Sequence, residues 1–176
     1  LAARSGLLIR ERSAFERARQ VQAMVFDKTG TLTEGRFAVT DVIPISVDDE
    51  TEVLRLAASL ESQSEHPIAA GIVQAATERE LDYPAPADFE VIPGRGAQGT
   101  VDAQQVRVVS GRYLEEQDLA AESQKADRAA EQGKTLVYVL AGDQVAGAVA
   151  LADVVRPQSH EAIRALRDKG IQVMML

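Results

Sequence analysis

The chain has 176 residues, of which 45% are hydrophobic and 26% charged, a composition typical of globular proteins with a packed core. It contains no cysteine and two histidines, which excludes disulfides, cysteine-ligated metal centres, thiol catalysis and a multi-histidine metal site. The net charge of −8 argues against a nucleic-acid-binding surface, because such surfaces need clustered cations.

The first half of the chain predicts a buried strand followed by a polar loop, then strands and a helical pair. The apolar run 23–26 ends in the turn-forming residues 27–33, so the strand delivers the loop at its carboxyl end. Residues 37–47 are rich in β-branched residues and predict one or two strands. Apolar residues at helical spacing predict helices over 48–62 and 67–81.

The second half of the chain predicts a mainly antiparallel region and then a return to strand–helix order. Strands are expected over 89–92, 100–102 and 105–109, a helix over 114–132, and a hairpin of 135–141 with 144–151 around Gly142-Asp143. Pro157 opens a last helix, and 171–176 begins an apolar strand. We therefore predict an α/β domain in two pieces, 1–34 and 151–176, that carries an α+β insert over 35–150.

The most specific chemical signal is the loop Asp27-Lys28-Thr29-Gly30-Thr31. Open parallel sheets bind ligands outside the carboxyl ends of their strands, so Asp27 is expected at a ligand site. A carboxylate there is ionised at neutral pH and can act as the nucleophile that accepts a phosphoryl group. Mg²⁺ bridging the carboxylate and the phosphate would remove their mutual repulsion.

Residues 27–33, Asp-Lys-Thr-Gly-Thr-Leu-Thr, resemble the phosphorylation motif of P-type ATPases. The resemblance implies that Asp27 becomes phosphorylated and that Asp27 and the main-chain carbonyl of Thr29 bind Mg²⁺. Small phosphatases with a similar loop carry a second aspartate at the position of Thr29, as a general acid and base. Its absence would slow hydrolysis of an aspartyl-phosphate by roughly 10²–10⁴, which favours a pump over a phosphatase.

A second motif, Ser64-Glu65-His66-Pro67-Ile68, lies between the two predicted helices. The residue before a proline avoids the helical region, so His66 is held extended at the helix start. Its imidazole could stack on or hydrogen-bond a purine, with Glu65 accepting from an exocyclic amine; helix capping alone is the alternative explanation. The motif is similar to the His-Pro signature of heavy-metal-transporting P-type ATPases, which implies a place in their nucleotide-binding domain.

A glycine-rich loop, Gly94-Arg-Gly-Ala-Gln-Gly99, fits the pattern G-x-G-x-x-G. A dinucleotide-binding fingerprint is rejected because a strand, not a helix, is expected after it. The loop is similar to one in the heavy-metal branch, which implies that Gly94 and Gly96 let the backbone approach the nucleotide. Relatives in the copper branch have Gly-Asn near Gly111, which we place in the site; Arg112 either contacts phosphate or is a surface charge.

These motifs, with 153–157 resembling a return hinge, follow the order of the cytosolic ATP-binding portion of a heavy-metal P-type ATPase, most closely a copper pump. The resemblance implies a partial phosphoaspartate-type, haloacid dehalogenase-like domain carrying a nucleotide-binding insert whose antiparallel sheet is flanked by helices. It also implies ATP and Mg²⁺ as ligands, the membrane, actuator and remaining phosphorylation domains of the pump as partners, and a cytoplasmic position.

Two later motifs of the family, Thr-Gly-Asp and Gly-Asp-Gly-x-Asn-Asp, are missing from the sequence. This chain alone is therefore expected to bind nucleotide but to hydrolyse little or no ATP. The transported cation is expected to bind in other segments of the pump. The alternatives are a stand-alone phosphatase or phosphotransferase, which Thr29 disfavours, and a nucleotide-binding module without catalysis.

Overall fold

A computed structural model describes residues 11–176, so the first ten residues of the predicted 1–34 segment lie outside the described residues. The described chain forms two compact units. The terminal unit contains the described residues up to Glu34 together with Val155–Leu176, and the insert unit contains Gly35–Val154. Within residues 11–176, none of the helices has the length and apolar content needed to cross a bilayer.

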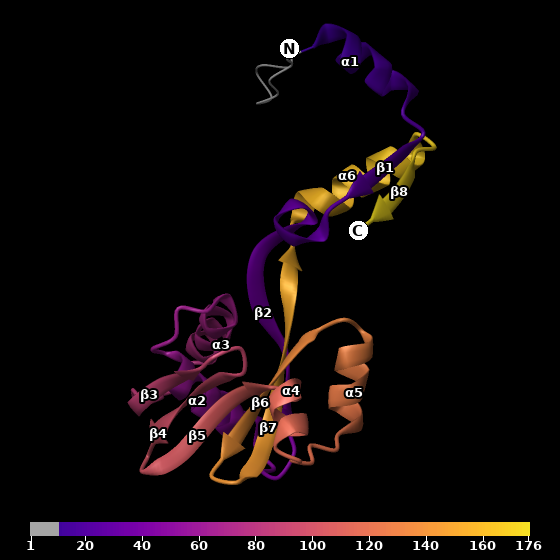
Figure 1. The fold of residues 1–176 in the computed structure, drawn as a ribbon. Helices are drawn as coiled ribbons and strands as arrows, with labels where there is room; N and C mark the ends of the chain where they lie inside the picture. Colours follow the sequence, from indigo (N-terminus) through magenta and orange to yellow (C-terminus); the bar gives the residue numbers. More distant parts are fainter. Residues whose placement is uncertain (1–10) are drawn as a thin grey trace. The chain divides into compact units, whose positions relative to one another are not determined.

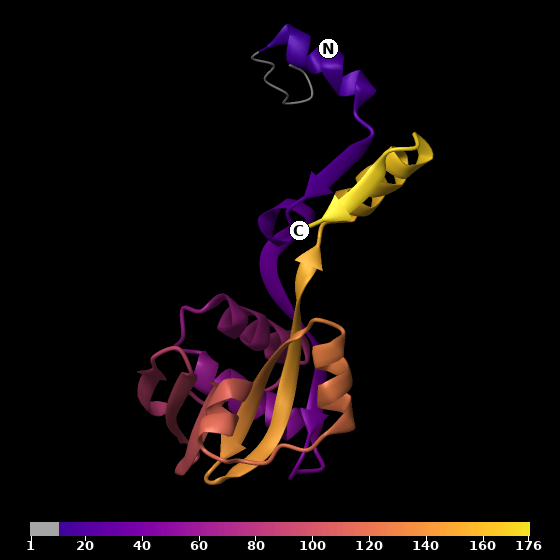
Figure 2. The same cartoon turned by 45° about the vertical axis from the view of Figure 1, so that its right-hand side comes forward.

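The terminal unit is built on two parallel strands. Its elements are α1 (Arg12–Arg17), the 3₁₀ turn η2 (Ala18–Gln20), β1 (Ala23–Phe26), the short helical turn η3 (Lys28–Leu32), α6 (Pro157–Asp168) and β8 (Gln172–Met175). Strands β1 and β8 run parallel (Figure 2), and in their register Ala23 lies opposite Gln172 and Phe26 opposite Met175. The carboxyl ends of the two strands therefore meet at one edge, which confirms the predicted parallel α/β fragment.

The insert unit contains one six-stranded sheet with the order β2-β7-β6-β5-β4-β3 (Figure 1). Pairing is antiparallel from β3 through β7. The strands are β2 (Thr33–Pro44), β3 (Ala87–Ile92), β4 (Gly96–Val101), β5 (Gln104–Ser110), β6 (Thr135–Ala141) and β7 (Gln144–Val155). Residues 96–99 of the glycine loop belong to β4, and β5 follows, so a strand and not a helix follows Gly94, as predicted.

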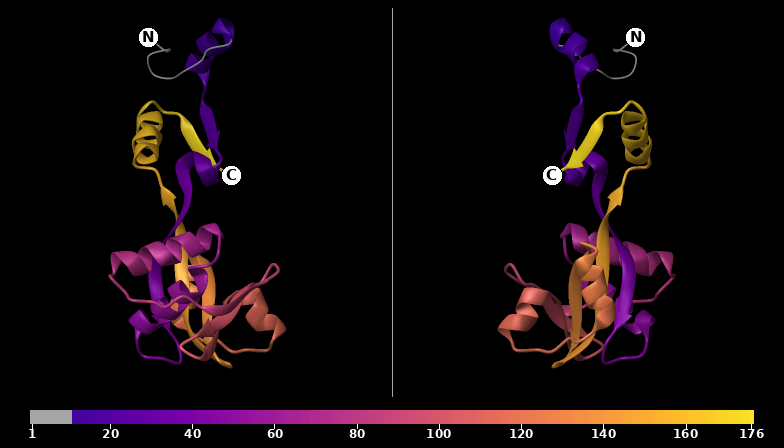
Figure 3. Two further views of the ribbon diagram at one scale, coloured as in Figure 1. Left: turned by 90° about the vertical axis from the view of Figure 1, so that its left-hand side faces the viewer. Right: turned by 90° about the vertical axis from the view of Figure 1, so that its right-hand side faces the viewer.

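Helices cover both faces of this sheet, because residues along its strands alternate between two apolar faces. Val137 and Val139 of β6 belong to the same buried cluster as α2 (Glu50–Glu61) and α3 (Pro67–Glu78). The alternating residues of the same strand, Leu136 and Tyr138, point to the other face of the sheet. They belong to the clusters that contain residues of α4 (Gly111–Glu116) and α5 (Gln124–Glu131). In Figure 3 the magenta helix α3 lies beside β2 and β7. The predicted antiparallel sheet with flanking helices is confirmed.

The single helix predicted over 114–132 is wrong, because the structure has two helices there, α4 and α5. Asp118 adopts a positive φ of 52°, which a helix cannot continue through, and Leu119 N donates to Leu114 O across the break at 2.9 Å. Ser123 then caps α5 by accepting from Ala126 N. Helical periodicity on both sides of the break concealed it in the sequence.

Candidate functional site

Asp27 directly follows β1. It is exposed, and it lies at the edge where the carboxyl ends of β1 and β8 meet. Leu176 N donates to Phe26 O at 2.9 Å, which extends the parallel pairing up to the residue before Asp27. Asp27 lies at the end of the predicted strand, but the prediction that this strand is buried is wrong, because β1 belongs to a two-stranded sheet and its residues are exposed or half-buried. Ligand binding at this edge stays a prediction.

The loop after Asp27 is folded back on itself by Thr33. The Thr33 hydroxyl oxygen accepts from Gly30 N at 3.1 Å and donates to Lys28 O at 3.0 Å. Thr33 is 2% exposed, so its hydroxyl is shielded from water, although its partner residues Lys28 and Gly30 are exposed. The loop containing Thr29 and Gly30 is therefore held by a side chain as well as by its own backbone.

The start of α6 holds the same loop from the other end of the chain. Arg156 donates from its backbone N to Leu32 O and from Nε to Thr33 O, each at 3.0 Å. Ser159 Oγ donates to Leu32 O at 2.8 Å across 127 residues of sequence. Arg156 was predicted as part of the return hinge; the contact of Ser159 had no signal in the sequence. Together they fix where the Asp27 loop ends.

Asp27 and Thr29 offer oxygen atoms of the kinds that Mg²⁺ accepts, a carboxylate and a main-chain carbonyl. Mg²⁺ in phosphate-binding sites keeps several waters and uses one or two carboxylates, so these two residues fit part of such a shell. The described residues contain no group of three or more His, Asp or Glu side chains that could hold a metal ion by themselves.

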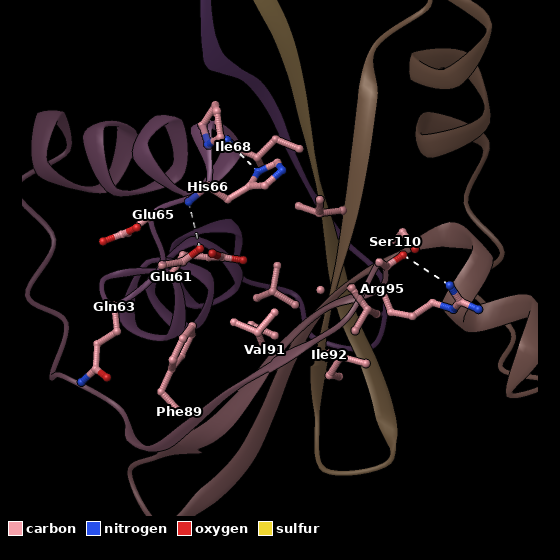
Figure 4. A pocket seen from close by; sticks show the side chains of 18 residues that line it. Glu61, Gln63, Glu65, His66, Ile68, Phe89, Val91, Ile92, Arg95 and Ser110 are labelled. Carbon is pink, nitrogen blue, oxygen red and sulfur yellow. Dashed lines mark hydrogen bonds between the residues drawn. The ribbon is translucent and has the colours of Figure 1, made fainter.

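The other predicted site residues belong to the insert unit, where a pocket of about 760 Å³ opens. Its walls are the junction of α2 and α3, the turn between β3 and β4, and the end of β5 (Figure 4). Glu65, His66, Gly94 and Gly96 all line it, and Gly111 directly follows the lining residue Ser110. The volume lies in the range of pockets that hold small molecules of nucleotide size.

His66 caps α3 while presenting its ring to the pocket. Its backbone is extended, with φ −71° and ψ 141°, and its Nδ1 accepts from Ile68 N at 3.2 Å. In a neutral imidazole with Nδ1 accepting, Nε2 carries the ring proton and is a donor. Capping and ligand binding, posed as alternatives from the sequence, are thus compatible at one residue.

Glu61 is a pocket residue that the sequence reasoning missed. It is 7% exposed, at the end of α2, and its side chain extends toward the pocket, whereas exposed Glu65 points away (Figure 4). Burial raises the pKa of the Glu61 carboxyl above its ordinary value of 4.5, and a hydrogen bond with Ser64 partly offsets this. The available signal was its spacing: Glu61 falls on the apolar face defined by Val53 and Ala57.

The glycine loop shapes the opposite wall of the pocket. Ile92 O accepts from Arg95 N at 2.9 Å, with Pro93 and Gly94 at the centre of the turn and a φ of +68° at Gly94. This is the residue arrangement of a type II turn. A side chain at Gly96 would place Cβ 2.0 Å from Val108 O, so only glycine lets β4 pack so closely on β5.

Gly111 and Arg112 begin α4 beside this wall. Ser110 N donates to Arg95 O at 2.8 Å, which ties the start of α4 to the glycine loop. Arg112 Nε contacts Glu116 Oε1 at 3.0 Å, and its side chain is 71% exposed. The hydroxyl of Ser110 is buried without a hydrogen-bond partner within residues 11–176.

Comparison with family profiles matches residues 21–176 to the haloacid dehalogenase-like hydrolases. The chain belongs to this family. It is 49% identical over 176 residues to copper-exporting P-type ATPase B of Archaeoglobus fulgidus, an alignment that covers 100% of this chain and 25% of that protein. The chain thus spans about a quarter of the length of this relative.

Solved structures of P-type ATPases share the fold of this haloacid dehalogenase-like chain. A zinc-transporting PIB-type ATPase in its E2·Pi state aligns with a TM-score of 0.83 and 32% identity, over 99% of this chain and 28% of that one. The catalytic domain of a CPx-ATPase, CopB-B, studied for conformational changes upon nucleotide binding, aligns with a TM-score of 0.70 and 25% identity, over 98% of this chain and 59% of that one. The predicted resemblance to the cytosolic region of heavy-metal P-type ATPases is confirmed.

Proposed function

We propose that this chain is the ATP-binding and phosphorylation region of a cation-exporting P-type ATPase, with copper as the exported ion. The observation that carries the proposal is the exposed Asp27 carboxylate at the carboxyl edge of a parallel strand pair, followed by a loop that Thr33 and Arg156 hold in place. The names of the relatives support the transport function, since the aligned Archaeoglobus fulgidus protein is a copper exporter.

The insert pocket is proposed to bind the adenine of ATP. Glu61 offers a buried acceptor for the exocyclic amine, and His66 offers an Nε2 donor on the same side of the pocket. Glu65 was the acceptor expected from the sequence, but its exposed carboxyl points away, so Glu61 is better placed. Gly94 and Gly96 form the facing wall, with Gly111 behind it.

The proposed chemistry is transfer of the γ-phosphoryl group of ATP to Asp27. A carboxylate oxygen forms a bond to the γ-phosphorus while the bond from that phosphorus to the β–γ bridging oxygen breaks, and ADP leaves with the electron pair. Mg²⁺, when held by Asp27 and the Thr29 carbonyl, supplies charge neutralisation for this step. Thr29 cannot activate water as an aspartate would, so the acyl phosphate persists.

The remaining parts of the pump are proposed partners. The relative that aligns along this entire chain is about four times longer, and its membrane and actuator parts would supply ion selectivity and the dephosphorylating step. The region described here would lie on the cytoplasmic side of the membrane. The transported cation is proposed to bind in those other parts of the pump.

Nucleotide binding is tested by titrating the 176-residue chain with ATP and following the His66 ring signals by NMR. We expect those signals to shift, and Glu61→Gln to weaken binding about tenfold because an amide replaces the carboxyl group that would accept the hydrogen bond from the exocyclic amine. Glu65→Gln is the matched control and should change affinity less than twofold. Saturating ATP that leaves the His66 ring unmoved would contradict the proposed pocket.

Phosphorylation is tested in the full-length pump that contains this region. Acid quenching after exposure to γ-labelled ATP should trap label on the protein, and Asp27→Asn should abolish it. Asp153→Asn, in the segment predicted as the return hinge, serves as a control aspartate and should retain the label. Persistence of label in the Asp27 variant would refute the assignment.

A further inference from the structure

One carboxylate beside the pocket holds two guanidinium groups. Arg95, which lies between Gly94 and Gly96 and lines the pocket, contacts Glu116 through Nε at 2.6 Å and Nη2 at 2.7 Å. Arg112 reaches the same carboxylate through Nε at 3.0 Å. The ion pair with Arg95 lowers the pKa of Glu116, so the carboxylate is ionised at neutral pH. The group thus carries a net positive charge.

The charges that line the pocket are otherwise unfavourable for a polyanion. Among its lining residues the acidic ones are Glu61, whose side chain extends toward the pocket, and Glu65, whose exposed carboxyl points away, and the only lysine or arginine is Arg95. A nucleoside triphosphate carries several negative charges that repel carboxylates at short range. Its phosphate groups therefore have one favourable direction, toward Arg95.

Two further groups at this wall suit phosphate oxygens. Arg95 uses Nε and Nη2 for Glu116, while its Nη1 makes only a 3.4 Å contact with Gly94 O. The planar fork of arginine allows one edge to stay on a carboxylate while the remaining N–H groups bind another anion. The buried Ser110 hydroxyl, unpartnered in the described chain, lines the same pocket and can donate to a second oxygen.

We propose that Arg95 binds the phosphate groups of the nucleotide and that Glu116 orients its guanidinium for this contact. The inference rests on the proposed ATP-binding function and assigns the residue that distinguishes ATP from the nucleoside. Glu116 fixes the edge formed by Nε and Nη2, which leaves Nη1 to the ligand. Arg112 pairs with the same carboxylate, and its side chain is 71% exposed. It adds a positive charge near the pocket without lining it.

The competing explanation is that the Arg95–Glu116 pair only fixes the turn between β3 and β4. The two explanations differ in which ligands they affect. A residue that only shapes the turn alters ATP and adenosine binding to the same extent, because both depend on the pocket. A residue that contacts phosphate alters ATP binding alone.

The experiment measures dissociation constants of ATP and adenosine for the 176-residue chain and its Arg95→Gln variant by calorimetry and NMR. We expect Arg95→Gln to weaken ATP about tenfold, the usual effect of losing one charge-assisted hydrogen bond, and to change adenosine less than twofold. The salt dependence of ATP binding should also become shallower, because one cation is lost. Arg95→Lys, which keeps the charge but not the fork, should recover part of the loss.

Arg55→Gln is the matched control. Arg55 holds Glu52 through Nε and Nη2 at 2.8 and 2.9 Å and also pairs with Asp102, but it does not line the pocket. It should leave ATP affinity within twofold. If Arg95→Gln fails to fold, as judged by tyrosine fluorescence, the dissociation constants of ATP and adenosine are compared between wild type and Arg95→Lys alone.

Equal weakening of ATP and adenosine, or no weakening of ATP, would overturn the role of Arg95. These outcomes differ from failure of the proposed function. If wild-type chain binds neither ligand, or binds ATP without moving the His66 ring, the pocket itself is misassigned and Arg95 has no phosphate to bind. If wild type binds both and only the effect of Arg95 is missing, the nucleotide site stands and this inference alone is wrong.

Discussion

Substitution of alanine for glycine at positions 94 and 96 should have very different costs, although both residues belong to the glycine loop. At Gly96 the backbone φ is +144°, and an added Cβ would lie 2.0 Å from Val108 O and 2.8 Å from Val109 Cα. At Gly94 the φ is +68°, and no atom lies within 4 Å of an added Cβ. The first position combines backbone strain with a clash against β5, and the second has strain alone.

The magnitudes follow from these two contributions. A non-glycine residue in a sparsely populated positive-φ region costs roughly 1–3 kcal/mol, and forcing an atom into a packed region costs roughly a further 1–3 kcal/mol. Gly96→Ala should therefore lower the free energy of unfolding by about 2–6 kcal/mol. Gly94→Ala should lower it by about 1–2 kcal/mol, the ordinary cost of a left-handed residue.

The assay is urea unfolding of the 176-residue chain followed by tyrosine fluorescence. All three tyrosines, at positions 83, 113 and 138, lie in the insert unit, and the chain has no tryptophan, so the signal reports unfolding of the insert. The midpoints of the two ranges predict that Gly96→Ala loses about 2–3 kcal/mol more than Gly94→Ala. Equal losses, or a loss below about 1 kcal/mol for Gly96→Ala, would show that β4 does not pack on β5 as described.

Two further predictions concern a buried acid and a buried hydroxyl. Because burial raises the folded-state pKa of Glu61, its contribution to stability is fully present below pH 4.5 and is lost as the pH rises through that folded-state pKa. Urea midpoints from pH 4 to 8 should therefore fall in wild type relative to Glu61→Gln, with exposed Glu65→Gln as control; a difference that does not vary with pH would contradict this. Thr33→Val removes the hydrogen bonds to Gly30 N and Lys28 O, so the terminal unit should lose about 2 kcal/mol of stability, and the measurement is faster exchange of the Gly30 amide with solvent, because the tyrosines of the insert do not report on this unit. Exposed Thr31→Val is its control, and unchanged exchange at Gly30 would exclude the Thr33 contact.

The elements that sequence reasoning predicted correctly are those with strong local signals. Pro67 can occupy only the first turn of a helix, so His66 had to be extended before it, and the structure has φ −71° there. The strand β1 and its loop followed from an abrupt change from apolar to polar residues at Asp27. The break at Asp118 was missed because an αL aspartate leaves no trace in the periodicity of neighbouring residues.

The site residues that could not be predicted depend on tertiary contacts. Glu65 was predicted because it adjoins His66 in sequence, and Glu61 was missed, because which of the two is buried depends on how β3 and β4 pack on the end of α2. Ser159 reaches Leu32 over 127 residues, a pairing that local pattern cannot show. From the sequence, Arg95 could either offset the charge of ATP or belong to a solvated face, and the choice could not be made because its ion pair with Glu116 joins separate elements.

The sheet order places β2 and β7, by which the chain enters and leaves the insert, on neighbouring strands. All three buried apolar clusters of the described chain, together with the side chains packed against them, fall within residues 35–154. A segment whose two ends are adjacent and whose core is its own can be accommodated in a host chain like a long surface loop. Such an insert can diverge in sequence or be exchanged between host domains while Asp27, the proposed phosphate acceptor, and its surroundings stay unaltered.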